Sequence, residues 1–168
     1  AQTVRRDQLP EMAELGMIAS FFVAHTYYWG DVHLENLGAD RARAISPMRS
    51  ALEAGVPCTL HQDTPVLPPD MIDTLWCACN RKSLSGADLG RGEQVTPYEA
   101  LQGVTVSAAR QYFEEDTQGT LRPGKLADLV ILSGNPLEVP PEQLRDIRVL
   151  ETFKEGVSVY RAKEADRA

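Results

Sequence analysis

A turn followed by a short apolar run, in residues 117–132, constrains the fold of this chain more than any other feature. The segment reads Thr-Gln-Gly-Thr-Leu-Arg-Pro-Gly-Lys-Leu-Ala-Asp-Leu-Val-Ile-Leu, with Pro123 and Gly124 at its centre. Proline fixes φ and glycine adopts backbone conformations that other residues avoid, so this pair predicts a tight turn. Four apolar residues then follow without a break, which predicts a short buried strand over residues 129–132.

Composition excludes several classes of protein. The 168 residues are 24% charged and 43% apolar, which is typical of a folded globular domain. The net charge is −7 and there is no basic run, so nucleic acid is not an expected partner. No apolar stretch approaches the roughly 20 residues that span a bilayer, so we expect no membrane contact either. The cysteines, Cys58, Cys77 and Cys79, argue against a disulfide framework and favour the cytoplasm.

Upstream of the turn, the chain alternates between helices and strands. A helix over 7–15 precedes a strand over 17–23, and a helix over 47–54 precedes a strand over 56–62; each helix ends at a glycine. This rhythm predicts an α/β fold with parallel strands. We also expect a loop over 25–31, and further helices over 69–81, from Thr96 to about Gly103, and over 105–113. Cys77 and Cys79 then become helix residues rather than half of a metal site.

Downstream of the turn, the pattern changes to strand, turn and strand. Residues 149–154 and 157–160 predict two strands joined at Glu155 and Gly156. We expect them to form one sheet with residues 129–132, separate from the upstream strands. The predicted division is therefore 1–116 for the α/β part, 117–161 for the strands of a small β-domain, and 162–168 for a charged, frayed tail.

Two residues follow directly on predicted strands. His25 follows the first strand and Asp63 follows the second. A parallel α/β barrel gathers its functional groups at the carboxyl ends of its strands. Imidazole and carboxylate are ligands of divalent metals, and an aspartate in such a site can accept a proton from metal-bound water. The alternatives are an ordinary loop histidine and an aspartate that caps its own turn.

His61 lies two residues before Asp63, so on an extended strand both side chains share one face. We expect His61 to bind substrate or to form hydrogen bonds near a metal, and we interpret His33 as a surface helix residue. Tyr27, Tyr28 and Trp29 follow His25 directly. Three adjacent aromatic residues cannot all face one core, so we expect some of them to bind substrate; a loop that plugs the barrel mouth is the alternative.

The order and spacing of many short strings resemble the C-terminal half of the YtcJ-like branch of the amidohydrolase superfamily, which includes N-substituted formamide deformylases. The resemblance runs from Ala1 to about Arg161. The strings that carry it are Gly-x-Leu-x-Pro-Gly-Lys-x-Ala-Asp-Leu-Val at the turn, Phe-Val-Ala-His-Thr-Tyr-Tyr-Trp-Gly-Asp around His25, Ser-Ala-Leu-Glu-Ala-Gly-Val before the second strand, Asp-Thr-Pro-Val from Asp63, and Asn-Pro-Leu from Asn135.

This resemblance implies the C-terminal part of a metal-dependent (β/α)8 TIM barrel and part of a small β-sandwich domain built from both chain ends. It implies that His25 is the metal ligand after strand six. It implies that Asp63, after strand eight, is both a metal ligand and the catalytic proton acceptor. The implied reaction is hydrolysis of an amide-like C–N bond in a small molecule, through water activated by one or two divalent ions of the zinc type.

The family's His-x-His pair on the first strand, the group on strand four and the strand-five histidine have no counterpart in this sequence. We therefore expect a fragment: an enzyme in the full-length parent, but an isolated chain that is inactive and can lack metal. Exposed sheet edges favour pairing with a second copy or with the missing N-terminal half. The alternatives are an inactive structural or oligomerising module, and a deaminase or cyclic-amide hydrolase of the same superfamily.

Overall fold

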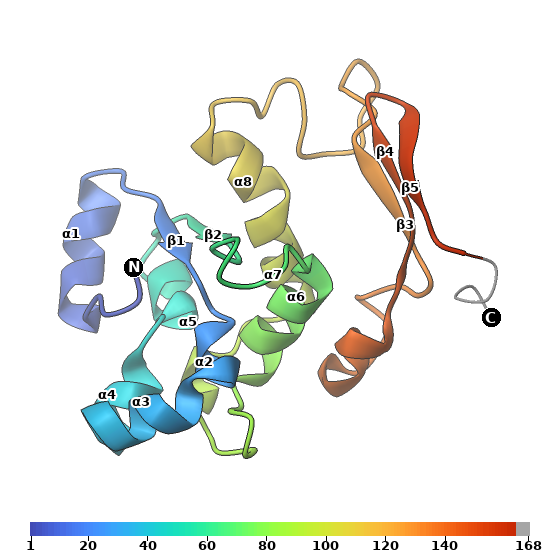
Figure 1. Cartoon of the computed structure of the whole chain (residues 1–168). Coiled ribbons are helices and arrows are strands. Elements are labelled where there is room, and N and C mark those ends of the chain that lie inside the picture. Colours follow the sequence, from blue (N-terminus) through green and yellow to red (C-terminus); the bar gives the residue numbers. More distant parts are fainter. Residues whose placement is uncertain (164–168) are drawn as a thin grey trace.

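The computed structural model describes residues 1–163, which form two parts with different kinds of sheet (Figure 1). The first part holds a parallel strand pair among short helices. Its elements are the 3-10 helix η1 (Arg6–Gln8), α1 (Leu9–Glu14), β1 (Ala19–Phe21), α2 (His25–Tyr28), α3 (Gly30–Leu37), α4 (Ala39–Ala44), α5 (Met48–Glu53), β2 (Cys58–Leu60), α6 (Met71–Asn80), the 3-10 helix η2 (Arg91–Glu93), α7 (Pro97–Val104) and α8 (Val106–Gln111). The second part holds β3 (Leu129–Leu132), the 3-10 helix η3 (Pro141–Asp146), β4 (Val149–Lys154) and β5 (Val157–Arg161).

The strands β1 and β2 pair directly and in parallel, with Ser20 opposite Thr59. The helices between them form the crossover that a parallel pair requires. Phe21 and Leu60, also opposite each other, are buried in the core. The α/β prediction is therefore confirmed, although each strand is shorter than its apolar run.

Local signals set the helix boundaries that the sequence predicts. Thr96 accepts a hydrogen bond from the backbone N–H of Glu99 (3.3 Å), and Glu99 accepts one from the N–H of Thr96 (2.7 Å), which forms a capping box at the start of α7. Cys77 and Cys79 are buried in α6, so their interpretation as helix residues is confirmed.

The loop prediction for residues 25–31 is wrong, because α2 and the start of α3 occupy this segment. The N–H groups of Tyr28 and Trp29 donate to the carbonyls of Ala24 and His25, at 3.1 and 3.0 Å. Such a short helix is not stable alone and depends on tertiary contacts. One such contact is the Tyr27 ring, which lies edge-on to Trp76 at 5.2 Å.

The second part is an antiparallel sheet in the order β3-β4-β5, with no pairing to β1 or β2 among the described residues. The prediction of a separate sheet is thus confirmed. The prediction that β3 is buried is wrong: Val130 and Ile131 are 52% and 45% exposed, because this sheet is only partly covered. The frayed tail is also corrected at its start, since Ala162 is buried and its N–H donates to the carbonyl of Leu150 (2.8 Å). The rest of that prediction, residues 164–168, lies outside the described residues.

The two parts meet where η3 packs against α6 (Figure 1). The indole N–H of Trp76 donates to the carbonyl of Glu142 (3.0 Å), and the side-chain amide of Asn80 donates to that of Pro141 (2.8 Å). The guanidinium of Arg145 lies over the rings of both Tyr27 and Trp76, 3.9 and 3.6 Å from their centroids. These contacts fix the β-sheet part against the α/β part.

No helix among the described residues is both long enough and apolar enough to cross a membrane.

Candidate functional site

The carboxyl ends of β1 and β2 bring two of the predicted site residues together. His25 begins α2, four residues after β1, and His61 follows β2 directly. The ring of Phe22 contacts both: it lies edge-on to His25 at 5.8 Å and stacks on His61 at 5.7 Å. Parallel pairing therefore places both histidines at the same end of the sheet, around one aromatic side chain.

His25 is held through one ring nitrogen only. It is buried, and its Nε2 shares a hydrogen bond with the Ser46 hydroxyl (3.0 Å). Its Nδ1 is buried and has no hydrogen-bond partner among residues 1–163. Burial, together with the nearby charges of His33 and Arg81, lowers the pKa of His25 to about 3. The ring is therefore neutral at pH 7, which is the form that binds metals.

A buried arginine fixes the residue that holds His25. The Arg81 guanidinium donates to the carbonyls of Ile45 (2.7 Å) and Ser46 (3.4 Å). Ser46 is itself fully buried with φ at +47°, a conformation that its surroundings must maintain. No local pattern in the sequence indicates Ser46 or Arg81, because their contacts join segments far apart in the chain.

Ser20 is a third site residue that the sequence did not indicate. Its hydroxyl shares a hydrogen bond with Nδ1 of His61 across the two strands (2.8 Å). This bond and the Phe22 stack fix the His61 ring, so its Nε2 is the nitrogen left for other partners. Burial lowers the pKa of His61, while the charge of Asp63 acts in the opposite direction. The one sequence feature that could have indicated Ser20 is its place as a polar residue in the middle of an apolar strand.

Asp63 lies just beyond β2 in a turn. Its φ is +54°, and its carbonyl accepts a hydrogen bond from the N–H of Val66 (2.9 Å). The turn interpretation is therefore correct for the backbone. The side chain is exposed, and its negative charge raises the pKa of the His61 ring against the effect of burial. The metal and catalytic roles of Asp63 stay predictions.

The aromatic residues 27–29 separate into different environments. Tyr27 packs between the two parts, against Trp76 and Arg145. Tyr28 is 38% exposed and shares a hydrogen bond with Asp73 (3.3 Å). Trp29 lies against Phe22 at 6.2 Å, beside the histidines. Tyr27 therefore contributes to the contact between the two parts, and substrate binding by Tyr27, Tyr28 and Trp29 stays a prediction.

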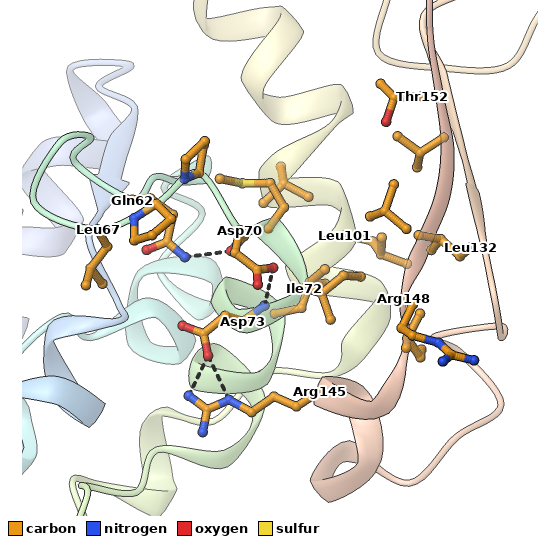
Figure 2. A pocket seen from close by; sticks show the side chains of 18 of the residues that line it. Gln62, Leu67, Asp70, Ile72, Asp73, Leu101, Leu132, Arg145, Arg148 and Thr152 are labelled. Atoms are coloured by element: carbon orange, nitrogen blue, oxygen red, sulfur yellow. Dashed lines mark hydrogen bonds and ion pairs between the residues drawn. The ribbon is translucent and has the colours of Figure 1, made fainter. Parts of the chain in front are cut away.

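A cleft of about 1040 Å³ lies between α6, α7 and the antiparallel sheet (Figure 2). Its lining is mainly apolar, with side chains such as Ile72, Leu101 and Leu132. At one end, the side-chain amide of Gln62 donates to the carbonyl of Asp70 (2.6 Å) and so ties down the segment that follows β2. His25, His61 and Asp63 do not line this cleft, so it lies beside the strand ends rather than at the candidate site.

Within residues 1–163, no group of three or more His, Cys, Asp or Glu side chains is arranged to hold a metal ion. His33, predicted as a surface residue, instead has its ring 5.1 Å from that of His25, with its Nε2 buried. The helix assignment of His33 is correct, and its side chain is half-buried rather than fully exposed, because α3 turns it toward α2.

The pairing of β1 with β2 also corrects the strand numbers that the resemblance implied. Strands six and eight of a barrel are separated by strand seven, yet β1 and β2 are direct neighbours. If Asp63 follows strand eight, His25 follows strand seven. A ligand role for His25 must therefore rest on its own chemistry rather than on the strand-six correspondence.

Comparisons with known proteins agree on one family. The model of the family described as Amidohydrolase family matches residues 1–160. The N-substituted formamide deformylase of Arthrobacter pascens is 31% identical over 150 residues, which cover 89% of this chain and 28% of that protein. The putative amidohydrolase YtcJ of Bacillus subtilis (strain 168) is 29% identical over 142 residues, covering 83% of this chain and 26% of that protein.

A solved structure, described as an uncharacterized metal-dependent hydrolase from Pyrococcus horikoshii, has a TM-score of 0.72 and 25% identity; the match covers 84% of this chain and 29% of that one. The chain thus spans little more than a quarter of each of these proteins. The family match extends over nearly all of the chain, so the chain belongs to the amidohydrolase family, in its YtcJ-like branch.

Proposed function

We propose that this chain is the C-terminal portion of a metal-dependent amidohydrolase that hydrolyses an amide-like C–N bond in a small molecule. In this proposal, β1 and β2 are two neighbouring strands of the TIM barrel. The observation that carries it is the direct parallel pairing of β1 and β2, which brings His25, His61 and the Asp63 turn to one end of the sheet. Parallel α/β folds place their catalytic groups at this end.

The donor set fits a divalent metal of the zinc type in part. His25 offers a neutral imidazole whose buried Nδ1 has no hydrogen-bond partner in the part of the chain that the structure describes, and its other nitrogen is already oriented by Ser46. Asp63 offers an exposed carboxylate. A ring held through one nitrogen with the other one open is how proteins present histidine ligands. His25 and Asp63 would hold the metal, together with ligands from the rest of the barrel.

A bound divalent ion would supply a Lewis acid that lowers the pKa of water. The chain's own residues supply the other parts. The Asp63 carboxylate can accept a proton from the attacking water. His61, oriented by Ser20, can hydrogen-bond a polar group of the substrate through Nε2, while Phe22 and Trp29 form an apolar wall. The name of the Arthrobacter relative supports N-substituted formamides as the substrate class.

The test is Asp63→Asn in the full-length protein, assayed against simple N-formyl and N-acyl amides. Asparagine is nearly isosteric but cannot accept the proton, so turnover should fall by about 10²- to 10⁴-fold. Asp116→Asn is the matched control, because Asp116 is also an exposed carboxylate but lies beyond α8. Full activity of Asp63→Asn would remove Asp63 from the mechanism. Metal-dependent turnover by residues 1–168 alone would contradict the partial-site proposal.

A second candidate is that the isolated chain is a structural module. The observation that favours it is β5, whose five residues are all exposed, with Val157 and Val159 65% and 61% exposed. An uncovered strand at a sheet edge can pair with a second copy or with the upstream half. Analytical ultracentrifugation separates the two candidates. A stable monomer that stays monomeric across concentrations would contradict self-pairing.

A further inference from the structure

The cleft between α6, α7 and the antiparallel sheet has one polar end in an otherwise mainly apolar lining (Figure 2). Its volume of about 1040 Å³ matches the larger small-molecule pockets, which occupy roughly 300–1,000 Å³ and often lie between two parts of a protein. Ile72 and Leu101 line it from the helices, and Leu132 lines it from β3. A molecule that fills this space therefore needs an apolar body.

Gln62 supplies an unused hydrogen-bond acceptor at the polar end of the cleft. Its side chain is only 4% exposed, and its Nε2 donates to the carbonyl of Asp70 (2.6 Å). Its Oε1 is buried and accepts no hydrogen bond from residues 1–163. Buried polar atoms in folded proteins almost always have a partner, so this oxygen indicates a donor that is not among the described residues.

Asp70 adds a negative charge beside this acceptor. It is the N-cap of α6, where its Oδ1 accepts the backbone N–H of Asp73 (3.0 Å). Its side chain is exposed, and it forms no ion pair within residues 1–163. The other carboxylate of the lining, Asp73, is already paired with Arg145 (2.5 Å) and accepts from the Tyr28 hydroxyl (3.3 Å). The unused groups at this end are therefore two acceptors, one of which is anionic.

We propose that the cleft binds an organic amine, whose apolar body lies between the helices and the sheet and whose protonated amino group donates to Gln62 and Asp70. A protonated amine carries both features that this end lacks, a positive charge and several N–H donors. A neutral alcohol or amide can donate to Gln62, but it leaves the charge of Asp70 unmatched. The ring of Tyr28 also lines the cleft and is of the kind that attracts organic cations.

The other charges around the cleft are compatible with a cation at this end. The charge of Arg145 is offset by Asp73. Arg148 also lines the cleft, but from the side of the sheet, away from Gln62 (Figure 2). The net charge of −7 favours cations over anions for the chain as a whole.

This inference does not depend on the proposed function, because His25, His61 and Asp63 do not line the cleft. A metal ion is a poor occupant, since residues 1–163 offer no group of three or more His, Cys, Asp or Glu side chains to hold one. The competing occupant is another segment of the full-length protein, which the experiment below distinguishes from an amine.

The experiment is a titration of residues 1–168 with n-octylamine at pH 7, where the amine is protonated, followed by ¹H–¹⁵N and ¹H–¹³C NMR. The side-chain amide signal of Gln62 and the methyl signals of Ile72, Leu101 and Leu132 should shift together and saturate at one amine per chain. Octanol and octanoate have a similar apolar body without the positive charge, and should bind at least about 5-fold more weakly. Butylamine has a shorter body and should bind at least about 10-fold more weakly.

Asp70→Asn tests the charge, because asparagine is an equally good N-cap and only the negative charge is removed. This variant should weaken octylamine binding by about 3- to 10-fold, a modest loss because the carboxylate is exposed. Asp116→Asn is the matched control. It removes another exposed carboxylate, outside the cleft lining, and should leave the affinity unchanged.

Three results with residues 1–168 would overturn the proposal: octanol or octanoate that binds as tightly as octylamine, shifts that miss Gln62 and the cleft methyl groups, or unchanged affinity in Asp70→Asn. If Asp70→Asn does not fold, the comparison of the probes on the unaltered chain decides. Octylamine that binds residues 1–168 but not the full-length protein would show that another segment fills the cleft, which also contradicts the proposal. Full hydrolysis by Asp63→Asn would refute the proposed role of Asp63 and leave amine binding intact.

Discussion

Three glycines between α6 and α7 allow the cost of one close backbone approach to be measured. Gly90 has φ at +96°, and a Cβ added there would lie 2.1 Å from the carbonyl oxygen of Arg43. Gly86 has φ at +85° but open space around it. Gly92 has neither a left-handed φ nor any atom within 4 Å of an added Cβ. Alanine at Gly90 therefore adds both backbone strain and a clash, alanine at Gly86 adds strain alone, and alanine at Gly92 adds neither.

The magnitudes follow from these differences. A left-handed conformation costs a non-glycine residue about 1–2 kcal/mol. The entropy that alanine removes from the unfolded chain returns about 0.4–1 kcal/mol. Gly92→Ala should therefore be neutral or slightly stabilising, and Gly86→Ala should destabilise by about 1 kcal/mol. Gly90→Ala adds a clash with backbone that cannot rotate away, and should destabilise by about 2–4 kcal/mol.

The assay is urea denaturation of residues 1–168, followed by far-UV circular dichroism and by the fluorescence of Trp29 and Trp76. The free energies of unfolding should rank Gly92→Ala, Gly86→Ala, Gly90→Ala from most to least stable. If Gly90→Ala costs no more than Gly86→Ala, the close approach to Arg43 is not present in solution. The packing of the segment that leads from Arg81 to α7 would then need revision, together with the role of Arg81 in holding Ser46.

Two further predictions concern contacts between distant segments. The Arg49 guanidinium donates to both oxygens of Glu99, and these bonds lower the pKa of Glu99 to about 2. A lowered carboxyl pKa stabilises the fold above the unfolded value of 4.5, and this stabilisation is lost as pH falls from 4.5 toward 2. Glu99→Gln keeps the helix cap and removes only the charge. In denaturation experiments it should lower the free energy of unfolding by about 1–2 kcal/mol at pH 7 and by almost nothing near pH 2. Equal losses at both pH values would contradict the ion pair. Ser20→Ala should change the tautomer of His61 seen by ¹⁵N NMR and lower kcat/KM of the full-length protein by about 10-fold. Ser20→Thr, which keeps a hydroxyl, should retain the tautomer and the kcat/KM of the wild type. An unchanged tautomer in Ser20→Ala would refute the positioning role of Ser20.

The sequence predicted those parts of the fold that depend on local chemistry. The glycines at 16 and 55 end their helices with φ at +66° and +82°, and the Thr96 capping box starts α7 where expected. The change from helix–strand alternation to a strand hairpin after Gly124 also corresponds to two separate sheets. Each of these signals lies within about five residues of the structure that it determines, so one sequence is enough to detect it.

Features that depend on distant partners could not be predicted in this way. The one-turn helix α2 has no helical apolar period and depends on contacts of Tyr27 with residues beyond position 70. The exposure of β3 depends on how many strands cover it, which the run of apolar residues does not record. The partial burial of His33 has the same cause, since only the packing of α3 against α2 turns its ring toward His25.

The candidate site contains residues that position the histidines and residues whose side chains are available for binding or catalysis. Ser46, Arg81 and Ser20 are engaged in hydrogen bonds, and each contributes to the position of a histidine. By contrast, Nδ1 of His25 is buried without a partner among the described residues, and the Asp63 carboxylate is exposed on a backbone with positive φ. Stability alone favours neither arrangement, because both an unmet buried nitrogen and a left-handed aspartate cost free energy. Local costs of this kind persist where the surrounding structure maintains them, and they concentrate at functional sites. The buried Nδ1 of His25 and the exposed carboxylate of Asp63 both occur just beyond the carboxyl ends of two parallel strands, and hydrogen bonds from other residues hold the histidine there, which is the strongest physical reason to place the chemistry at this end of the sheet.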